Sequence, residues 1–335
     1  MRRLLCAALA ALMLTTLAAC ESGGSPEATE KATEQITESV PKTENLTNEP
    51  TVGSHDILSL DFIQTFDQNP TMDEQPVYEK DGVTVTAKAL RYDTVSGPQI
   101  MLSIRNDTEN DYLIQNNYTT VNGFMIRPEL DVTVKKHKKI EAPMSLPYLS
   151  LAMANIHTLK DISFSLRLLD SKSFAVAGVT PIVKLKLKNT AEKLPPYNES
   201  GQTAFDEKGV KIVLQGVKKD SLFENSCVLK VYMVNNTDQT VCIKNNRLAV
   251  NGYDITVSMN TPILPGMRAV DKIELYDRDL EEYGVTVIDN VKVSFEIYEY
   301  EEWKLIASSK LVTTELPTEI AAEEAETPAP TQAAK

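Results

Sequence analysis

Residues 106–126 read NDTENDYLIQNNYTTVNGFMI, and residues 235–255 read NNTDQTVCIKNNRLAVNGYDI. Laid over one another at an offset of 129 residues, the two stretches share nine of 21 positions without a gap. Self-similarity at a fixed spacing is the sequence signature of a repeated structural unit. The sequence therefore predicts two copies of one fold.

The duplication extends beyond this stretch on both sides. Downstream, the same offset aligns two runs whose apolar residues alternate as in a β-strand, at 162–168 and 291–297. Upstream, Gly82-Val83-Thr84-Val85 aligns with residues 209–212 after a length change of two residues. These limits predict a first domain over 77–190, a linker with prolines at 191–203 and a second domain over 204–313.

Each copy is predicted to be all-β. Short runs rich in Val, Ile, Thr, Tyr and Phe alternate with turn residues, a pattern that favours a β-sandwich. Asn122-Gly123 and Asn251-Gly252 suit two-residue type I′ hairpins, because both residue types tolerate positive φ. The Asn-x-Thr sites at 106–108 and 235–237 predict a further hairpin turn, with side chains bonded to nearby backbone.

One short helix is expected in each copy. In the second copy, Asp279 is predicted to cap the start of a helix over 280–283, and Gly284 to end it in the left-handed conformation. The offset of 129 places Ser150 and Asn155 at the same two positions of the first copy.

This arrangement resembles the immunoglobulin-like domains of lipoproteins from Gram-positive bacteria. The resemblance rests on the Gly-Val-x-Val strand, the Asn-x-Thr site, the Asn-Gly hairpin, the one-turn helix and the late alternating strand. It implies two tandem immunoglobulin-like β-sandwich domains over about two thirds of the chain. Its motifs are structural and many members have no known function, so the resemblance implies no catalytic residue.

The N-terminus reads as an export signal. Arg2 and Arg3 precede an uncharged apolar run that ends at Ala19 and is too short to span a bilayer comfortably. The run closes on Leu17-Ala18-Ala19-Cys20, which resembles the lipobox of bacterial lipoproteins. That resemblance implies cleavage between Ala19 and Cys20 and a lipid on the Cys20 thiol, anchoring the chain to a cell membrane outside the cytoplasm. The alternative is an ordinary secretory signal with a chance cysteine.

Composition sets the ends of the chain apart from its middle. Residues 20–55 and 314–335 have few large apolar side chains, which predicts a disordered stalk and a disordered acidic tail. An irregular lead-in is expected at 56–76. The net charge is −13, and loss of residues 1–19 would leave 32 basic against 47 acidic residues, or −15. Nucleic acid is therefore not an expected partner, because its binding requires basic surface.

Outside the cytoplasm, only Cys227 and Cys242 would remain to form a disulfide. A hairpin turning near 236–238 would place Cys242 opposite a residue near Met233, several positions from Cys227. We therefore favour two buried free thiols over a disulfide.

The sequence contains no motif for catalysis, metals or cofactors. His55, His137 and His157 lie on different segments and lack metal-ligand spacing. A phosphate loop, a dinucleotide fingerprint and a Gly-x-Ser-x-Gly elbow are all missing from the sequence. We expect a protein that is not an enzyme and uses neither cofactor nor metal.

A basic run is the first candidate binding surface. It contains Lys135, Lys136, Lys138 and Lys139, and it would suit wall polymer, lipid headgroups or an acidic partner. The alternative is a solvated loop.

An acidic stretch at 296–302 is the second candidate, because Tyr298, Tyr300 and Trp303 add aromatic anchors to its charge, as binding surfaces often do. The alternative here is a hairpin with a polar face and a buried Trp303. A third group fits no known calcium loop and is explained more simply by a capped helix; it comprises Asp277, Asp279, Glu281 and Glu282.

These features predict a non-enzymatic lipoprotein whose tandem modules bind or present a ligand or partner at the cell envelope. Membrane lipid would be contacted through Cys20, and an envelope protein or wall polymer would be the partner. Two alternatives stay open: an accessory subunit of a membrane transporter, sensor or secretion complex, and an envelope hydrolase or inhibitor with an unrecognised site.

The anchor is tested by replacing Cys20→Ala. Without the thiol that accepts lipid, the chain should move from the membrane pellet to the soluble fraction, which cell fractionation and immunoblotting would measure. Cys6→Ala is the control, because Cys6 lies in the segment to be removed and its loss should leave the chain in the pellet. Retention of the Cys20→Ala chain in the membrane would contradict the lipid anchor.

Overall fold

The computed structural model describes residues 58–219 and 226–314. The predicted signal peptide, Cys20, the stalk and His55 lie outside these residues, as does the predicted acidic tail except Thr314, which ends the last strand.

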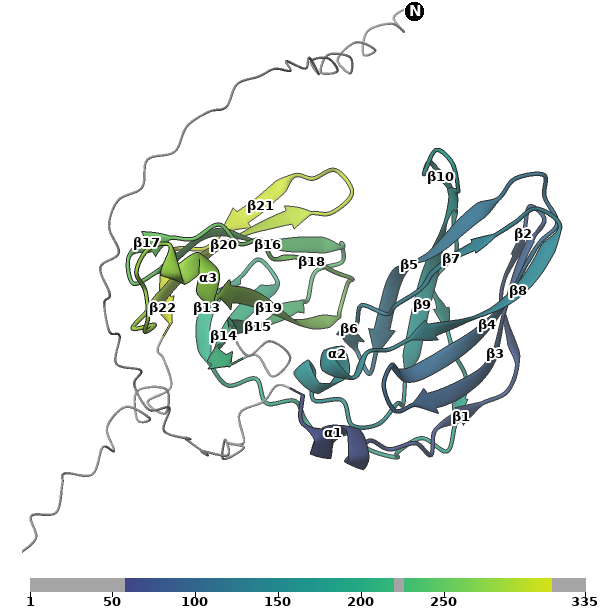
Figure 1. Ribbon diagram of the computed structural model, residues 1–335, viewed down its shortest axis with the longest axis horizontal. Helices are drawn as coiled ribbons and strands as arrows, with labels where there is room; N and C mark the ends of the chain where they lie inside the picture. The colour runs from purple at the N-terminus through teal and green to yellow at the C-terminus, as the bar shows by residue number, and fades with distance from the viewer. Residues whose placement is uncertain (1–57, 220–225, 315–335) are drawn as a thin grey trace, which may run out of the picture. The chain divides into compact units, whose positions relative to one another are not determined.

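The first domain consists of two antiparallel sheets (Figure 1). One has the strand order β2-β3-β4-β8, and the other contains β5, β6, β7, β9, β10 and β11. The strands are β2 (Gln75–Lys80), β3 (Val83–Asp93), β4 (Gly97–Asn106), β5 (Tyr112–Val121), β6 (Phe124–Met125), β7 (Asp131–Val134), β8 (Lys138–Ser145), β9 (Ile162–Asp170), β10 (Val176–Val179) and β11 (Val183–Lys184). Alternate residues of these strands meet in one core, because side chains of a strand point to opposite faces in turn.

The second domain repeats this plan. One sheet has the order β13-β14-β15-β19, and the other contains β16, β17, β18, β20, β21 and β22. The strands are β13 (Gln202–Glu207), β14 (Val210–Lys219), β15 (Ser226–Asn235), β16 (Val241–Val250), β17 (Tyr253–Asp254), β18 (Asn260–Ile263), β19 (Arg268–Tyr276), β20 (Val291–Glu299), β21 (Leu305–Ser308) and β22 (Val312–Thr314). A separate core fills the space between the two sheets.

The strand order confirms two tandem immunoglobulin-like sandwiches. Each described strand of the first domain from β2 to β11 has its counterpart in the second, in the same order and with the same pairing. In the first copy β4 and β8 pair in one sheet while β5 and β9 pair in the other, so the chain passes between sheets after β4 as immunoglobulin topology requires. The duplication inferred from the sequence is therefore a duplication of fold.

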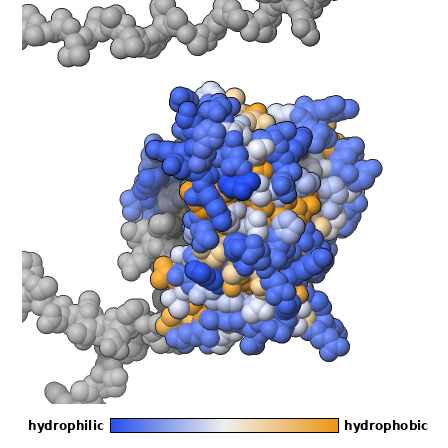
Figure 2. Space-filling model, turned by 90° about the vertical axis from the view of Figure 1, so that its right-hand side faces the viewer, coloured by the Kyte–Doolittle hydropathy of each residue, from blue (hydrophilic) through white to orange (hydrophobic). Residues whose placement is uncertain are grey.

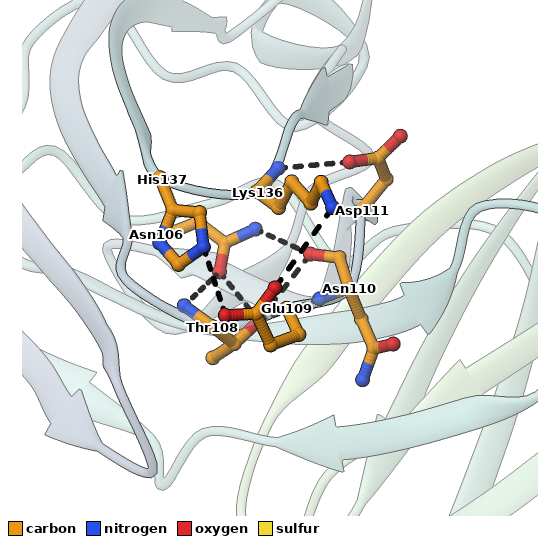
Figure 3. A network of polar contacts seen from close by, with 7 residues as sticks. All are labelled: Asn106, Thr108, Glu109, Asn110, Asp111, Lys136 and His137. Carbon is orange, nitrogen blue, oxygen red and sulfur yellow. Dashed lines mark hydrogen bonds and ion pairs between the residues drawn. The ribbon is translucent and has the colours of Figure 1, made fainter.

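The Asn-x-Thr sites do not form the predicted hairpin turns. The segment after β4 crosses to the other sheet, and so does the segment after β15. At this crossing the Asn106 side chain is buried, and its amide donates to the carbonyls of Asn110 (2.7 Å) and Val134 (3.1 Å). Its oxygen accepts from the backbone N–H and the hydroxyl of Thr108 (3.0 and 2.8 Å), as Figure 3 shows.

Asn235 makes the same four bonds in the second domain. Its amide donates to the carbonyls of Gln239 (2.8 Å) and Ile263 (2.9 Å), and its oxygen accepts from Thr237 twice. The sequence identified the residues and their bonding to local backbone. The crossing was not predicted, because residues close to one another in the chain do not indicate which sheet the next strand joins.

The Asn-Gly hairpins are confirmed in both copies. Asn122 and Gly123 have φ of 52° and 82°, and Asn251 and Gly252 have 49° and 91°, as a type I′ turn requires. The Asn122 oxygen also accepts from the backbone of Lys160 (2.9 Å) and Asp161 (3.0 Å). Each turn is thereby tied to the segment that leads into the late strand.

The short helices begin earlier than predicted, and the second ends at Glu281 instead of Tyr283. They are α2 (Tyr148–Met153) and α3 (Asp277–Glu281), and neither start has a side-chain cap, so the expected caps by Ser150 and Asp279 are wrong. The preceding strand β19 runs up to Tyr276, which places the helix start directly after it. Asn155 (φ 52°) and Gly284 (φ 67°) hold the left-handed positions at the ends, which confirms that part of the prediction.

The predicted irregular lead-in contains regular structure. Helix α1 (Leu60–Thr65) begins at Ser59, whose hydroxyl accepts from the Phe62 N–H at 3.1 Å. Phe62 and Phe66 are buried against Tyr148 of α2. Strand β1 (Thr71–Met72) then pairs with β12 (Leu187–Lys188). The lead-in is therefore part of the first domain. In the sequence, Ser59 is the residue type that indicates where this helix begins.

The two domains are joined by backbone pairing as well as by the chain. Phe124 and Met125 of β6 pair in parallel with Arg268 and Ala269 of β19, so one sheet continues from the first domain into the second. The Arg268 N–H donates to the Gly123 carbonyl at 3.0 Å. The Asn-Gly turn of the first domain thus also holds the second domain.

Cys227 and Cys242 do not form a disulfide. The register differs from the predicted one, since Cys242 lies opposite Tyr298 and Pro262 and not near Met233. Its thiol is fully buried and lies 2.6 Å from the side-chain oxygen of Asn260. Cys227 is only half-buried.

The buried asparagines predict a stability effect that is the same in both copies. Asn106→Ala and Asn235→Ala should each lower the free energy of unfolding by about 1–3 kcal/mol, because buried carbonyls lose their donors. Asn110→Ala is the matched control, since Asn110 is exposed and contributes only backbone groups to the network. Denaturant unfolding of the full chain measures the effect, and equal stability of Asn106→Ala and Asn110→Ala would contradict it.

The Cys242 thiol predicts a pH effect. Burial raises the pKa of Cys242 from 9.0 to about 11. The contribution of the protonated thiol to stability is thus complete below pH 9 and is lost as the pH rises toward 11. We expect Cys242 to resist iodoacetamide at pH 8 in the folded chain and to react once the chain is unfolded, as peptide mass spectrometry would show. Rapid native labelling at pH 8 would refute this.

Candidate functional site

Aromatic side chains gather where β20 turns into β21. Tyr298 and Trp303 stack with ring centroids 5.5 Å apart and an interplanar angle of 29°, and Tyr300 meets Trp303 edge-on at 6.0 Å. The Lys244 ammonium lies over the rings of Tyr298 (5.8 Å) and Trp303 (6.0 Å). We call Tyr118, Tyr298, Tyr300 and Trp303 the aromatic cluster.

The hairpin presents Trp303 at its tip. Trp303 is 48% exposed and Tyr300 37% exposed, so the alternative of a buried Trp303 is wrong. Trp303 also has a left-handed backbone (φ 57°), a conformation that costs a residue with a Cβ roughly 1–2 kcal/mol. The Glu299 carboxylate braces this turn by accepting from the N–H groups of Glu301 (2.9 Å) and Glu302 (2.5 Å). The backbone conformation alone would favour glycine at position 303.

The first domain contributes the fourth member of the cluster. Tyr118, on β5, meets Tyr300 with ring centroids 6.0 Å apart and an interplanar angle of 67°. Burial, and after it the neighbouring Tyr300, raises the pKa of Tyr118, so its hydroxyl stays protonated at neutral pH. Sequence reasoning missed Tyr118 because its counterpart in the second copy is Arg247, which gives no aromatic signal.

The predicted linker contacts both domains. Tyr197 stacks on Tyr232 of the second domain at 4.9 Å and contacts Phe124 of the first at 5.1 Å. An ion pair across the junction joins Arg127 and Asp271 at 2.8 Å. The aromatic cluster is therefore built on a braced junction.

The basic run lies elsewhere, on the turn between β7 and β8. Its residues are exposed, but the Glu109 carboxylate contacts His137 (3.0 Å) and Lys136 (3.8 Å), as Figure 3 shows. The Lys136 N–H donates to Asp111 at 2.8 Å. Acidic residues thus offset part of the positive charge. The other lysines of the run are Lys135, Lys138 and Lys139, and no described ion pair involves them.

Two hollows share Tyr197 and Asn155 as lining residues. One, of about 300 Å³, is lined by polar groups that include Asn155, Gln215 and Lys230, and the other, of about 230 Å³, includes His157 and Arg268. Among the described residues that line them there is no Asp or Glu, so converging carboxylates do not occur there. Figure 2 shows one face of the chain, where hydrophilic side chains predominate and apolar ones are dispersed.

The remaining candidates stay apart. Asp277 and Asp279 lie on α3, where Asp279 pairs with Arg278 at 3.0 Å. Within residues 58–219 and 226–314, no three His, Cys, Asp or Glu side chains are grouped so as to hold a metal ion. His157 packs on Phe62 at 4.6 Å.

None of the helices in the described part of the chain is both long and apolar enough to cross a membrane.

Comparison with known proteins gives only distant structural likenesses. No family model and no curated protein matches the chain. A structure of the YadV chaperone is 12% identical, covers 69% of this chain and 100% of its own, and has a TM-score of 0.22. Red sea bream transglutaminase is 11% identical over 74% of this chain and 30% of its own, with a TM-score of 0.20. A protein of unknown function from Porphyromonas gingivalis W83 is 11% identical over 70% and 100%, with a TM-score of 0.19.

Proposed function

We propose that this protein is a non-enzymatic lipoprotein, anchored outside the cytoplasm through lipid on Cys20, that binds an envelope protein through the aromatic cluster. In this proposal it is related to the lipoproteins of Gram-positive bacteria that carry tandem immunoglobulin-like domains. The observation that carries the binding role is the geometry of Trp303. It is half exposed and held at the tip of a hairpin in a backbone conformation that favours glycine.

Binding energy in protein interfaces is concentrated in a few aromatic or arginine side chains near the centre of the contact. The aromatic cluster offers such anchors with little conformational entropy to lose, because its rings already stack on one another. An aromatic residue in a backbone conformation that favours glycine carries a conformational cost, which the contacts of its ring must offset. We propose that contact with a partner adds to those contacts.

Charge favours a protein over an anionic polymer as the partner. Glu299, Glu301 and Glu302 lie in the same hairpin turn as Trp303 and outnumber the neighbouring Lys244 and Lys304, so the turn would repel a polyphosphate backbone. The lysine run, the other candidate for a polymer, is partly offset by Glu109 and Asp111. We therefore propose a partner that presents apolar and basic groups to the cluster.

Trp303→Ala tests this role. The lipidated full chain and its variants would be crosslinked in their own cells, and bound proteins quantified by mass spectrometry. We expect one dominant membrane or envelope protein, reduced at least tenfold by Trp303→Ala, since loss of an interface anchor typically costs 2 kcal/mol or more, roughly a 30-fold change in affinity.

Tyr283→Ala provides the matched control. Tyr283 is 42% exposed and stacks on Tyr253, beside the opposite end of β16 from the hairpin. This variant should capture as much partner as the unchanged chain. Equal capture by Trp303→Ala, or retention of wall polymer by all chains with no protein partner, would overturn the proposal. A transporter, sensor or secretion component as the captured protein would identify the chain as an accessory subunit.

A further inference from the structure

One terminal strand in the first domain, β10, is apolar and uncharged. β10 is the terminal strand of its sheet and pairs only with β9 among the described strands. Residues 173–183 contain no charged side chain. Four large apolar side chains here are between 51% and 64% exposed, namely Phe174, Val176, Val179 and Ile182.

The second domain protects the same edge. Its counterpart of β10 is β21, which is flanked by Lys304 and Lys310 at the positions equivalent to Ala175 and Pro181. The Lys208 ammonium also donates to the carbonyl of Ile306 in β21 at 2.6 Å. The position equivalent to Lys208 in the first domain is Asp81, which cannot donate such a bond. A bulge interrupts both edges, so it does not explain the difference.

Charge at an edge strand is a common means of preventing its pairing with another chain. The second domain has this protection and the first domain does not, although both descend from one unit. An open edge that is apolar and uncharged is a template for strand addition. We therefore expect another strand to pair with this edge, because an unpaired apolar edge strand promotes aggregation.

We propose that β10 pairs antiparallel with β10 of a second copy of this chain. The full chain carries a net charge of −13, so two copies repel one another over most of their surface. The uncharged stretch 173–183 lets them approach with least repulsion. Antiparallel pairing of one strand with itself is a two-fold contact that consumes both open edges and leaves none for further growth. Pro181, which lacks an N–H, bounds the paired stretch.

The test compares two equivalent substitutions. Val176→Lys places a charge on β10, and Leu305→Lys places the same charge at the position 129 residues later on β21. Both residues are exposed, so the fold should accept lysine at either site. Sedimentation equilibrium of the full chain would be measured in mild detergent, and again with Cys20→Ala so that shared micelles cannot imitate a dimer.

We expect twice the single-chain mass for the unchanged chain and for Leu305→Lys, and a single-chain mass for Val176→Lys. Ala175→Lys, which introduces the lysine found at the equivalent position 304 of the second copy, should also give a monomer. This second variant keeps the test valid if Val176→Lys fails to fold. Thermal unfolding would confirm that the variants remain folded. An unchanged chain that stays monomeric at every chain concentration measured would overturn the proposal. A dimer that survives both lysine variants, or a different protein strand bound to β10, would also overturn it.

Discussion

The fold of each domain depends on one buried asparagine amide at the crossing between its sheets. A chain that leaves one sheet for another breaks its ladder of backbone hydrogen bonds and leaves carbonyls without donors. Asn106 and Asn235 supply those donors from inside the core, and their oxygens hold the following threonine in place. With the crossing fixed, β5 and β16 enter the second sheet in the register that buries their apolar faces.

The crossing also contacts the hairpin turn that precedes it in the same domain. The backbone N–H of Asp107 donates to the Gly82 carbonyl at 2.8 Å, and Asn236 does the same to Gly209 at 2.7 Å. A Cβ at Gly82 would lie 2.9 Å from the Thr108 methyl group, and one at Gly209 3.0 Å from that of Thr237. The glycine and the Asn-x-Thr site therefore form one constraint, which explains why both recur in each copy.

The two copies keep this frame and differ at their surfaces. The tip of the late hairpin holds an aromatic residue with φ of 57° in both, Phe174 in one and Trp303 in the other. Of the two, only Trp303 has aromatic neighbours among the described residues, because Tyr298 and Tyr300 lie beside it in the second domain. Tyr118 of the first domain extends this group by contacting Tyr300. The edge strands differ as well, because β10 of the first copy lacks the two lysines, Lys304 and Lys310, that flank β21 in the second. The two domains therefore share a frame and differ in the side chains that they expose.

The sequence by itself determined the duplication, the all-β class, the Asn-Gly turns and the left-handed ends of the short helices. These features depend on periodicity and on hydrogen bonds between residues close in the chain, which a local pattern reports. It also singled out Tyr298, Tyr300 and Trp303 as a surface.

Only the tertiary structure decided that the Asn-x-Thr segments cross between sheets, that helix α1 packs on Tyr148, and that Tyr118 completes the aromatic cluster. It also decided which strand is an open edge. Each of these depends on contacts between residues far apart in sequence. Such contacts are fixed by burial of the whole core and of the junction, and no local pattern encodes them.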